Sequence, residues 1–249
     1  MTPRAYIGDT GLSPVAGAPL VLPDATARHV THALRMRRGD ALTLFTGAGG
    51  EWLSTIASLS RHEVVVVPQR HDPVERESAH RVTLVQAVIA ADAMDFVVRK
   101  AVELGVATIV PLVAGRSQAP DRDRLLRRHG HWMQIVIAAC EQCGRNRIPS
   151  VAAPIGWDDW IAGGFAPDAA PVLVERSADD GLAAVHAHAA IDTIIVGPEG
   201  GFTETEVGDA VARGARVAHL GAQHSRWCSS TGADARCGAP LAPRRASVR

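Results

Sequence analysis

The chain has 249 residues, of which 47% are hydrophobic and 21% are charged, and its formal net charge at neutral pH is +0. This composition is typical of a globular protein with a sizeable core, and zero net charge argues against a protein that coats nucleic acid by bulk charge, although a local basic patch remains compatible with it. No apolar run is long enough for a membrane helix and the N-terminus lacks a signal-peptide layout, so we expect a cytoplasmic protein without membrane contact.

The first part of the chain, to about Pro68, consists of short apolar runs separated by glycine-containing turns. The runs LTLF, WLSTIASL and EVVVV have the length of strands and predict a small β-barrel or sandwich. A helix is predicted in DATARHVTHALRMRRGD, where Val30, Ala33 and Leu34 recur at helical spacing and Asp24 or Thr26 is the expected N-cap. The polar stretch QRHDPVERESAHR that follows predicts an interdomain linker.

From Val82 the pattern changes to strands that alternate with helices. The strand-like runs are VTLVQAVI, ATIVPLV, PVLVE, DTIIVG and ARVAHLG. The helical stretch DAMDFVVRKAVELG, which ends at Gly105, places these residues on one face: Met94, Val97, Val98, Ala101 and Leu104. This alternation predicts a mainly parallel sheet whose ligands bind at the carboxyl ends of the strands.

The stretch VGPEGGFTETE lies between one of these strands and the next helix. Gly197 to Gly201 carry little side-chain bulk, so a ligand can approach their backbone closely. Thr203 and Glu206 match a capping box, which predicts that a helix begins here. Backbone amides in such a loop bind polar edges of ligands, and the alternative is a tight turn without a ligand. The P-loop, GxGxxG, GxSxG and HExxH patterns are all absent.

Two polar clusters are candidates for contact with nucleic acid. The run EQCGRNR places Glu141, Arg145 and Asn146 at a helix end, where such side chains suit phosphates and base edges, unless this is only a solvated helix terminus. The run RHVTHALRMRRGD concentrates arginine and histidine beside the predicted barrel, either for RNA or as a plain basic helix. Cys140 and Cys143 form a CxxC without a second pair, so we predict no metal site.

In order along the chain, RHVTHALRMRRGD, RKAVELGVATIVPL with GRS, EQCGRNRIP and IVGPEGGFTETE resemble the motifs of the RsmE family, the SPOUT-class methyltransferases of uracil N3 in small-subunit ribosomal RNA. The resemblance implies an α/β protein with a PUA-like β-barrel over residues 1–72 that binds RNA and a knotted SPOUT domain over residues 80–221. It implies a homodimer that uses S-adenosylmethionine and acts on 16S ribosomal RNA or the small ribosomal subunit. An RNA-binding protein without catalysis, and a SPOUT methyltransferase of transfer RNA, stay open as alternatives.

The resemblance also implies site residues by position. The expected cofactor-binding residues are Val174, Glu175, Gly197, Pro198, Glu199, Gly200, Gly201, Leu220 and Gly221. The expected RNA-binding residues are Arg4, His29, Arg35, Arg37, Arg38, Arg145, Asn146 and Arg147. Methylation of uracil N3 needs a proton acceptor, for which Glu199 and Glu141 are the nearest carboxylates and a bound water is the alternative. Arg145 completes the expected catalytic set by holding a phosphate or a uracil carbonyl.

The last part of the chain departs from the family pattern. After Gly221 the family continues with a run of the type R-[IV]-L-R-x-[ED]-T-A and a closing apolar helix, which complete the knot and the cofactor pocket. Residues 222–249 show neither helical nor alternating periodicity here, and their composition is typical of a disordered tail or of a GC-rich gene read out of frame. We therefore predict weak or absent binding of the cofactor.

Overall fold

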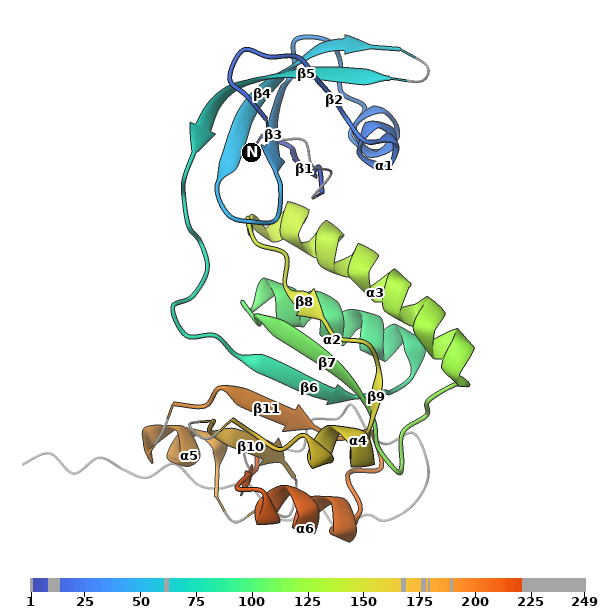
Figure 1. Ribbon diagram of the computed structural model, residues 1–249, viewed down its shortest axis with the longest axis vertical. Helices are drawn as coiled ribbons and strands as arrows, with labels where there is room; N and C mark the ends of the chain where they lie inside the picture. Colours follow the sequence, from blue (N-terminus) through green and yellow to red (C-terminus); the bar gives the residue numbers. More distant parts are fainter. Residues whose placement is uncertain are drawn as a thin grey trace, which may run out of the picture.

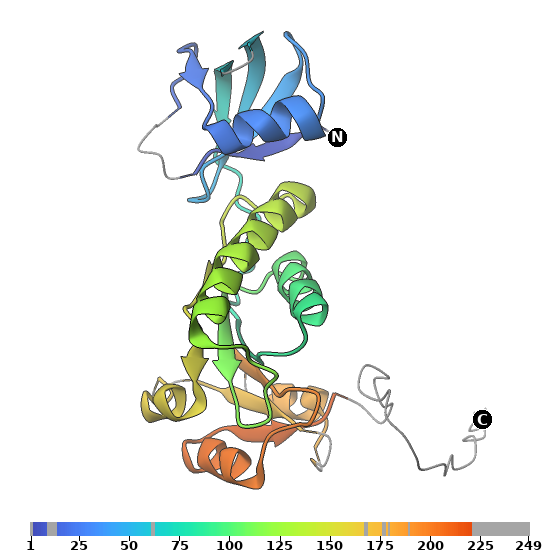
Figure 2. The same ribbon diagram turned by 90° about the vertical axis from the view of Figure 1, so that its right-hand side faces the viewer.

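The computed structural model describes residues 2–8, 14–60, 63–166, 169–175, 178, 180–188 and 190–220. Within them the chain forms two sheets toward opposite ends of an elongated molecule, and helix α3 (Arg122–Cys143) lies between the two sheets (Figure 1, Figure 2). Gly221 and the predicted atypical tail, residues 222–249, lie outside the described residues.

The N-terminal sheet has five strands in the order β1-β3-β4-β5-β2. Its strands are β1 (Arg4–Tyr6), β2 (Leu20–Val21), β3 (Ala41–Phe45), β4 (Glu51–Leu59) and β5 (Val64–Asp72). The pair β1 and β3 is parallel, and the other pairs are antiparallel. Leu42, Leu44, Ile56 and Val66 point into one core, as expected for strands with one buried face. The predicted small β domain is therefore confirmed.

The helix predicted in this domain takes an uncommon form. Helix α1 (Asp24–Arg28) continues directly into a turn of π-helix, η1 (His29–Ala33), a form that is rare and often found at functional sites. The N-cap is Pro23, which has no side-chain cap hydrogen bond, so the predicted caps are wrong. Asp24 already lies in the first turn, and Thr26 donates its hydroxyl to a backbone carbonyl of β1 at 2.7 Å.

The second sheet has seven strands, in the order β12-β10-β11-β6-β7-β8, with β9 also paired to β7. Its strands are β6 (Thr83–Ala87), β7 (Thr108–Val113), β8 (Ser150–Val151), β9 (Ile155–Gly156), β10 (Pro171–Val174), β11 (Thr193–Val196) and β12 (Arg216–Ala218). Each of these pairs is parallel, which confirms the predicted parallel sheet. The short strands β8 and β9 were not predicted, because two residues are too few to form a pattern.

Helices cover both faces of this sheet (Figure 1). Besides α3, they are α2 (Ala91–Glu103), α4 (Trp157–Ala162), α5 (Leu182–His188) and α6 (Glu204–Ala212). The side chain of Ile109 is buried against α2 and α3, whereas Leu112 of the same strand is buried against α4 and α6. Leu104 is 84% exposed, contrary to its predicted place on the buried face of α2, because it is the C-cap where the chain turns at Gly105. Among the described helices, none is long and apolar enough to cross a membrane.

Candidate functional site

The stretch predicted to bind a ligand connects β11 with α6 at the carboxyl end of the strand. Thr203 is the N-cap of α6, and its Oγ1 accepts a hydrogen bond from the Glu206 N–H at 3.2 Å. In return, Glu206 Oε2 accepts from the Thr203 N–H at 2.8 Å, so the predicted capping box is confirmed. An added Cβ on Gly197 would lie 3.1 Å from the ring of Phe202, so a side chain there would force the ring to shift.

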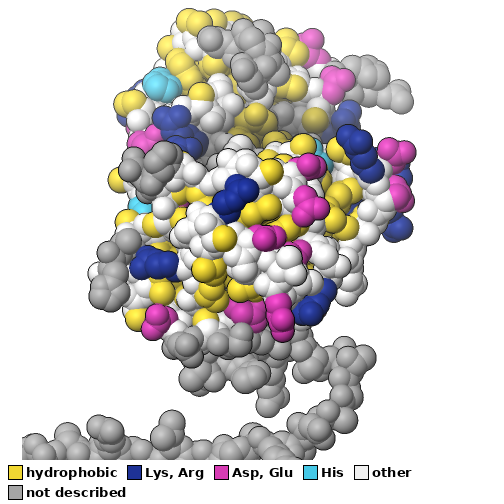
Figure 3. Space-filling view, turned by 60° about the horizontal axis from the view of Figure 1, so that its bottom comes forward, with side chains coloured by type: hydrophobic (Ala, Val, Ile, Leu, Met, Phe, Trp, Pro, Cys, Tyr) yellow, Lys and Arg dark blue, Asp and Glu magenta, His cyan; other side chains and the backbone are white. Residues whose placement is uncertain are grey.

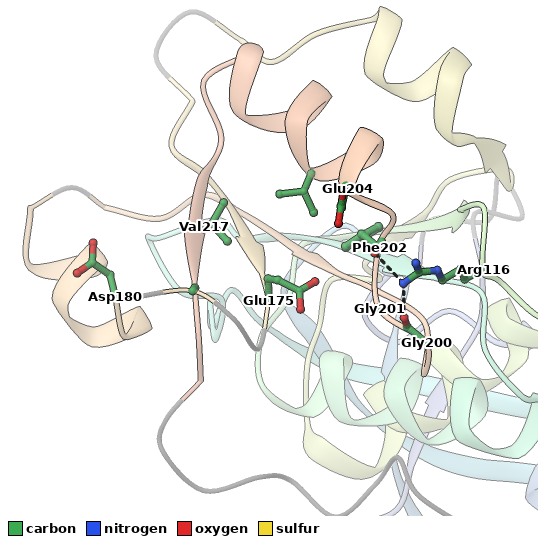
Figure 4. Close-up of a pocket in the computed structure, with 10 residues that line it drawn as sticks. Arg116, Glu175, Asp180, Gly200, Gly201, Phe202, Glu204 and Val217 are labelled. Carbon is green, nitrogen blue, oxygen red and sulfur yellow. Dashed lines mark hydrogen bonds between the residues drawn. The ribbon is translucent and has the colours of Figure 1, made fainter. Parts of the chain in front are cut away.

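A second loop, which follows β7, holds this turn in place. Glu206 is only 5% exposed, and its other oxygen, Oε1, accepts from the Gly115 N–H at 2.7 Å. From the next residue, Arg116 Nη1 donates to the carbonyls of Gly200 at 2.9 Å and Phe202 at 3.1 Å (Figure 4). Hydrogen bonds with a charged partner are stronger than neutral ones. The conformation of residues 200–203 is therefore fixed from two sides.

A cavity of about 560 Å³ opens beside this turn, within the size range of small-molecule sites. It is lined by Arg116, Glu175, Ala178, Asp180, Gly200, Gly201, Phe202, Glu204, Val207 and Val217. The carboxylate of Glu175 points toward the Gly200–Gly201 turn (Figure 4), and an added Cβ on Gly201 would lie 3.6 Å from its Oε2. Gly201 has a φ of 69°, a conformation that glycine adopts without strain. Glycine therefore keeps this side of the cavity clear.

The charged lining of the cavity is acidic on balance. Glu175, Asp180 and Glu204 contribute carboxylates, and Arg116 is the one cationic side chain among the described residues that line it. A phenylalanine ring and two valine side chains provide an apolar part. Figure 3 brings this end of the molecule forward and shows acidic side chains spread over it, with basic side chains between them. Such a lining favours a ligand that combines positive charge with an apolar group.

Glu199 belongs to the same turn but contacts the start of α2. Its Oε1 accepts a hydrogen bond from the Ala90 N–H at 3.4 Å. Its Oε2 is buried and has no hydrogen-bond partner among the described residues. A buried carboxylate oxygen without a donor is uncommon in proteins, and it retains the capacity to accept a hydrogen bond or a proton.

The cluster EQCGRNR lies at the junction between the two sheets and does not line the cavity. Glu141 Oε1 accepts from the Tyr6 N–H of β1 at 3.0 Å. Arg145 is 7% exposed, and its Nε donates to Glu77 Oε1 at 2.9 Å. The Nη1 of Arg145 donates to two backbone carbonyls at the end of α2, at 3.0 and 2.9 Å. Glu141 and Arg145, two of the three predicted catalytic residues, are thus hydrogen-bonded within the protein.

The residues predicted to bind RNA occupy two different environments. Arg35, Arg37 and Arg38 are exposed on the turn that follows η1. Arg35 has a φ of 51° and is the only non-glycine residue with a positive φ in the described part of the chain. Non-glycine residues pay a conformational cost in this region, and such residues cluster at functional sites.

The remaining predicted RNA contacts lie at the domain junction. Arg4 and Asn146 are 9% and 0% exposed, and their side chains are hydrogen-bonded to each other. His29 Nε2 lies 3.7 Å from a carboxylate oxygen of α3, and Arg147 Nε donates to Glu75 Oε2 at 2.7 Å. A contact of Arg4 or Asn146 with RNA would require the junction to open, so the structure places these two inside the protein and not on the predicted RNA surface.

The CxxC of α3 is explained by packing. Cys140 is fully buried, and burial raises the pKa of its thiol to about 12. Because the thiolate is the reactive and metal-binding form, a thiol with this pKa is inert at neutral pH.

Comparisons with known proteins agree with this arrangement of domains. A model of the RNA methyltransferase domain matches residues 76–230, and a model of the RNA methyltransferase PUA domain matches residues 22–69. The crystal structure of ribosomal RNA small subunit methyltransferase E from Neisseria gonorrhoeae, bound to S-adenosylmethionine, is 31% identical, has a TM-score of 0.84, and the match covers 91% of this chain and 92% of that one. The chain belongs to the RsmE family.

Curated members of the RsmE family show the same similarity. The methyltransferase E of Synechocystis is 28% identical over 208 residues, which cover 82% of this chain and 67% of that protein. The enzyme of the same name from Bacillus subtilis is 26% identical over 189 residues, which cover 72% of this chain and 73% of that protein. The fold class is accordingly a SPOUT-type α/β domain with an N-terminal PUA-like domain, as predicted.

Of the predicted cofactor-binding residues, Glu175, Gly200 and Gly201 line the cavity. The other described ones do not line it: Val174, Gly197, Pro198, Glu199 and Leu220. Three charged residues that line it were missed: Arg116, Asp180 and Glu204. Arg116 belongs to the GRS run that carries the resemblance to the RsmE family, so a signal for it existed. No pattern marks Asp180. The binding role of all these residues stays a prediction.

Proposed function

We propose that the protein transfers a methyl group from S-adenosylmethionine to N3 of a uridine in 16S ribosomal RNA. The observation that carries this proposal is the turn at residues 200–203, which Glu206 and Arg116 fix at the carboxyl edge of a parallel sheet, beside a cavity. Membership of the RsmE family supports the reaction class, and the relative from Neisseria gonorrhoeae is bound to the same cofactor.

The cavity fits this cofactor in size and in chemistry. S-adenosylmethionine carries a sulfonium and an ammonium group, and we propose that Glu175, Asp180 and Glu204 attract these charges. We also propose that the backbone at Gly200 and Gly201 holds the cofactor closely, together with Val174, Gly197, Pro198, Leu220 and Gly221 on the flanking segments. When bound, the cofactor supplies a methyl group activated by a positively charged sulfur.

Glu199 is the proposed proton acceptor. Neutral uracil carries a hydrogen on N3, and this proton must leave before or during attack by the nitrogen. Glu199 has a buried oxygen without a described donor, whereas the two oxygens of Glu141 face the Tyr6 N–H and His29 at the domain junction. The geometry thus favours Glu199 over Glu141.

Arg116 is the proposed contact to the uracil. Its Nη1 donates to the carbonyls of Gly200 and Phe202, whereas none of the described residues accepts a hydrogen bond from its Nε or Nη2. These N–H groups can donate to a uracil carbonyl and stabilise the negative charge that develops when N3 loses its proton. Arg35, Arg37 and Arg38 of the PUA-like domain are the proposed contacts to RNA phosphates.

The proposal is tested with small ribosomal subunits from a strain that lacks this gene. Purified protein, subunits and saturating isotope-labelled cofactor are incubated, and the methylated nucleotide is mapped by mass spectrometry. We expect label on N3 of a uridine in 16S ribosomal RNA. Label in transfer RNA, or RNA binding without methyl transfer, would support the alternatives and contradict the proposal.

Two parts of the proposal concern assembly and the tail. We infer a cytoplasmic homodimer, which sedimentation equilibrium tests, since a monomer at micromolar concentration would contradict it. The atypical segment 222–249 predicts weak or absent cofactor binding, and calorimetric titration tests this directly. Ordinary low-micromolar affinity would show that the departure from the family pattern does not impair the pocket.

A further inference from the structure

The segment that joins the two domains is tied to both of them by charged side chains. Residues 73–82 connect β5 with β6. Arg76 donates through both terminal nitrogens to Glu51 of the N-terminal sheet, at 2.7 and 3.1 Å. The next residue, Glu77, accepts hydrogen bonds from two nitrogens of Arg145, which follows α3. Arg76 Nη1 also donates to the Gly144 carbonyl at the end of α3 at 3.4 Å, so this segment is attached to both domains.

The two domains also meet directly at the same place. Arg4 of β1 forms an ion pair with Glu51 and donates to the side chain of Asn146. The Gly49 N–H, in the turn between β3 and β4, donates to the Asn146 carbonyl at 3.1 Å. An added Cβ on Gly49 would lie 2.9 Å from Arg147, so this turn fits closely against the segment after α3.

The side chains that join the two domains form one largely buried network, which we term the junction clasp. It consists of Arg4, Glu51, Arg76, Glu77, Arg145 and Asn146. Arg4, Glu51 and Arg145 are between 7% and 9% exposed, and Asn146 is fully buried. Buried charges are costly unless they are paired and hydrogen-bonded. Movement of one domain relative to the other would separate these pairs, so the clasp opposes it.

We propose that the junction clasp fixes the distance between the RNA-binding arginines of the PUA-like domain and the methyl-transfer cavity, which makes Arg76, Glu77 and Arg145 positioning residues for the RNA substrate. This inference rests on the proposed function. Helix α6 and strand β12, which contribute to the lining of the cavity, lie at the opposite end of the molecule from the N-terminal sheet, with α3 between them (Figure 1). RNA held by the N-terminal domain is therefore presented to the cavity from a distance that the domain arrangement sets. A misplacement of about 1 Å at a reacting centre can lower a rate about 100-fold.

The test compares Glu77→Gln, which releases the linker from Arg145, with Arg76→Gln, which releases it from Glu51. The side chain of Arg76 is 39% exposed, so we expect its replacement to leave the fold intact. In this variant Glu51 keeps its ion pair with Arg4. Glu103→Gln is the matched control, since it removes an exposed ion pair with Lys100 on α2. Glu77→Asp keeps the charge and provides a conservative rescue.

Three measurements are made on each full-length variant: the interdomain distance distribution by small-angle X-ray scattering, cofactor affinity by calorimetry, and kcat and KM for the RNA. We expect Glu77→Gln and Arg76→Gln to broaden the distances and to lower kcat for RNA about 10-fold or more, with cofactor affinity within about twofold of the parent. The control Glu103→Gln should match the parent, and Glu77→Asp should recover part of the loss.

Unchanged distances in both variants would overturn the inference, and so would broadened distances with unchanged kcat and KM. A parallel loss of cofactor affinity would also contradict it, because it would indicate general destabilisation. If the parent protein methylates no ribosomal RNA, the proposed function fails, whereas the scattering data still decide whether the clasp holds the domains together.

Discussion

The domain junction and the candidate cofactor cavity are built from the same residue types, arginine, glutamate and glycine, yet they differ in how these residues are used. At the junction, Arg145 is almost fully buried and donates to a carboxylate and to backbone carbonyls. At the cavity, Arg116 is exposed and keeps N–H groups without a described partner. A charged side chain that is fully paired within the protein, such as Arg145, holds parts of the protein in place. A charged side chain that keeps available donors beside a cavity, such as Arg116, can bind a ligand.

The largest expected effect comes from Gly201→Val. The substitution forces a branched side chain into a left-handed backbone conformation and places it beside Glu175 in the cavity. We expect loss of cofactor binding and a drop of about 100-fold or more in kcat/KM, measured by calorimetry and methyl-transfer kinetics. Gly105→Val is the matched control, because Gly105 has a φ of 88° and open space around it. Equal losses in both variants would mean that backbone strain, not the cavity, is responsible.

Arg116→Ala should have the next largest effect. It removes the donor that fixes the Gly200 and Phe202 carbonyls and also the one described cation of the cavity lining. We expect kcat to fall about 10- to 100-fold, while Arg116→Lys should lose less because it keeps the charge. Arg99→Ala, an exposed arginine on α2, is the control. Full activity of Arg116→Ala would show that the cavity does not depend on this arginine.

The junction makes a specific contribution to acid stability. A hydrogen bond from Arg76 and a weaker contribution from Arg4, together with the positive charges of both, lower the pKa of Glu51 to about 2. Partial desolvation of the carboxylate opposes this shift. Because the folded-state pKa lies below the unfolded one, this stabilisation is present above the unfolded pKa and is lost as the pH falls toward about 2.

Between about pH 5 and about pH 3 the loss at Glu51 amounts to about 2 kcal/mol of unfolding free energy. Glu51→Gln should therefore be less stable than the parent at neutral pH but should lose less stability over this interval. Urea unfolding at both pH values measures the difference. Identical pH dependence in parent and variant would contradict the role assigned to Glu51.

The smallest expected effect comes from Arg35→Gly, which should change RNA affinity and thermal stability in opposite directions. Because Arg35 adopts a positive φ, Arg35→Gly relieves a conformational cost of about 1 kcal/mol while it removes a charge proposed to contact RNA. We expect equal or higher thermal stability with RNA affinity reduced severalfold, as measured by filter binding. Arg38→Gly, on the same exposed turn, should weaken RNA binding without the gain in stability. Unchanged RNA affinity in Arg35→Gly would remove this turn from the RNA-binding surface.

The sequence predicted the parts of the fold that depend on local patterns. Valine- and isoleucine-rich runs define β5, β7 and β11, and the spacing of Thr203 and Glu206 marks the start of α6. Local patterns failed at helix ends: Leu104 fits the apolar period of α2, but it is the C-cap and is exposed. The π-turn η1 was missed because its sequence also fits an ordinary helix.

The site was predicted only in part, because its geometry depends on residues distant in sequence. Gly200 and Gly201 could be recognised from one short run, but their support comes from Gly115 and Arg116, on the loop after β7. Likewise, Arg145 is rich in donors and suggests phosphate binding, whereas its partner Glu77 lies 68 positions earlier in the chain. A single sequence does not reveal such pairings, and they decide whether a charged residue faces a ligand or the protein.

The central claim is that the cavity beside the Gly200–Gly201 turn binds S-adenosylmethionine for methylation of uridine N3 in 16S ribosomal RNA. The most direct test is mass-spectrometric mapping of the methylated nucleotide after incubation of gene-deleted small subunits with saturating cofactor and either the parent protein or Gly201→Val. We expect N3-methyluridine in 16S ribosomal RNA with the parent and none with the variant. Equal methylation by both proteins, or none by the parent at a saturated cofactor site, would contradict it.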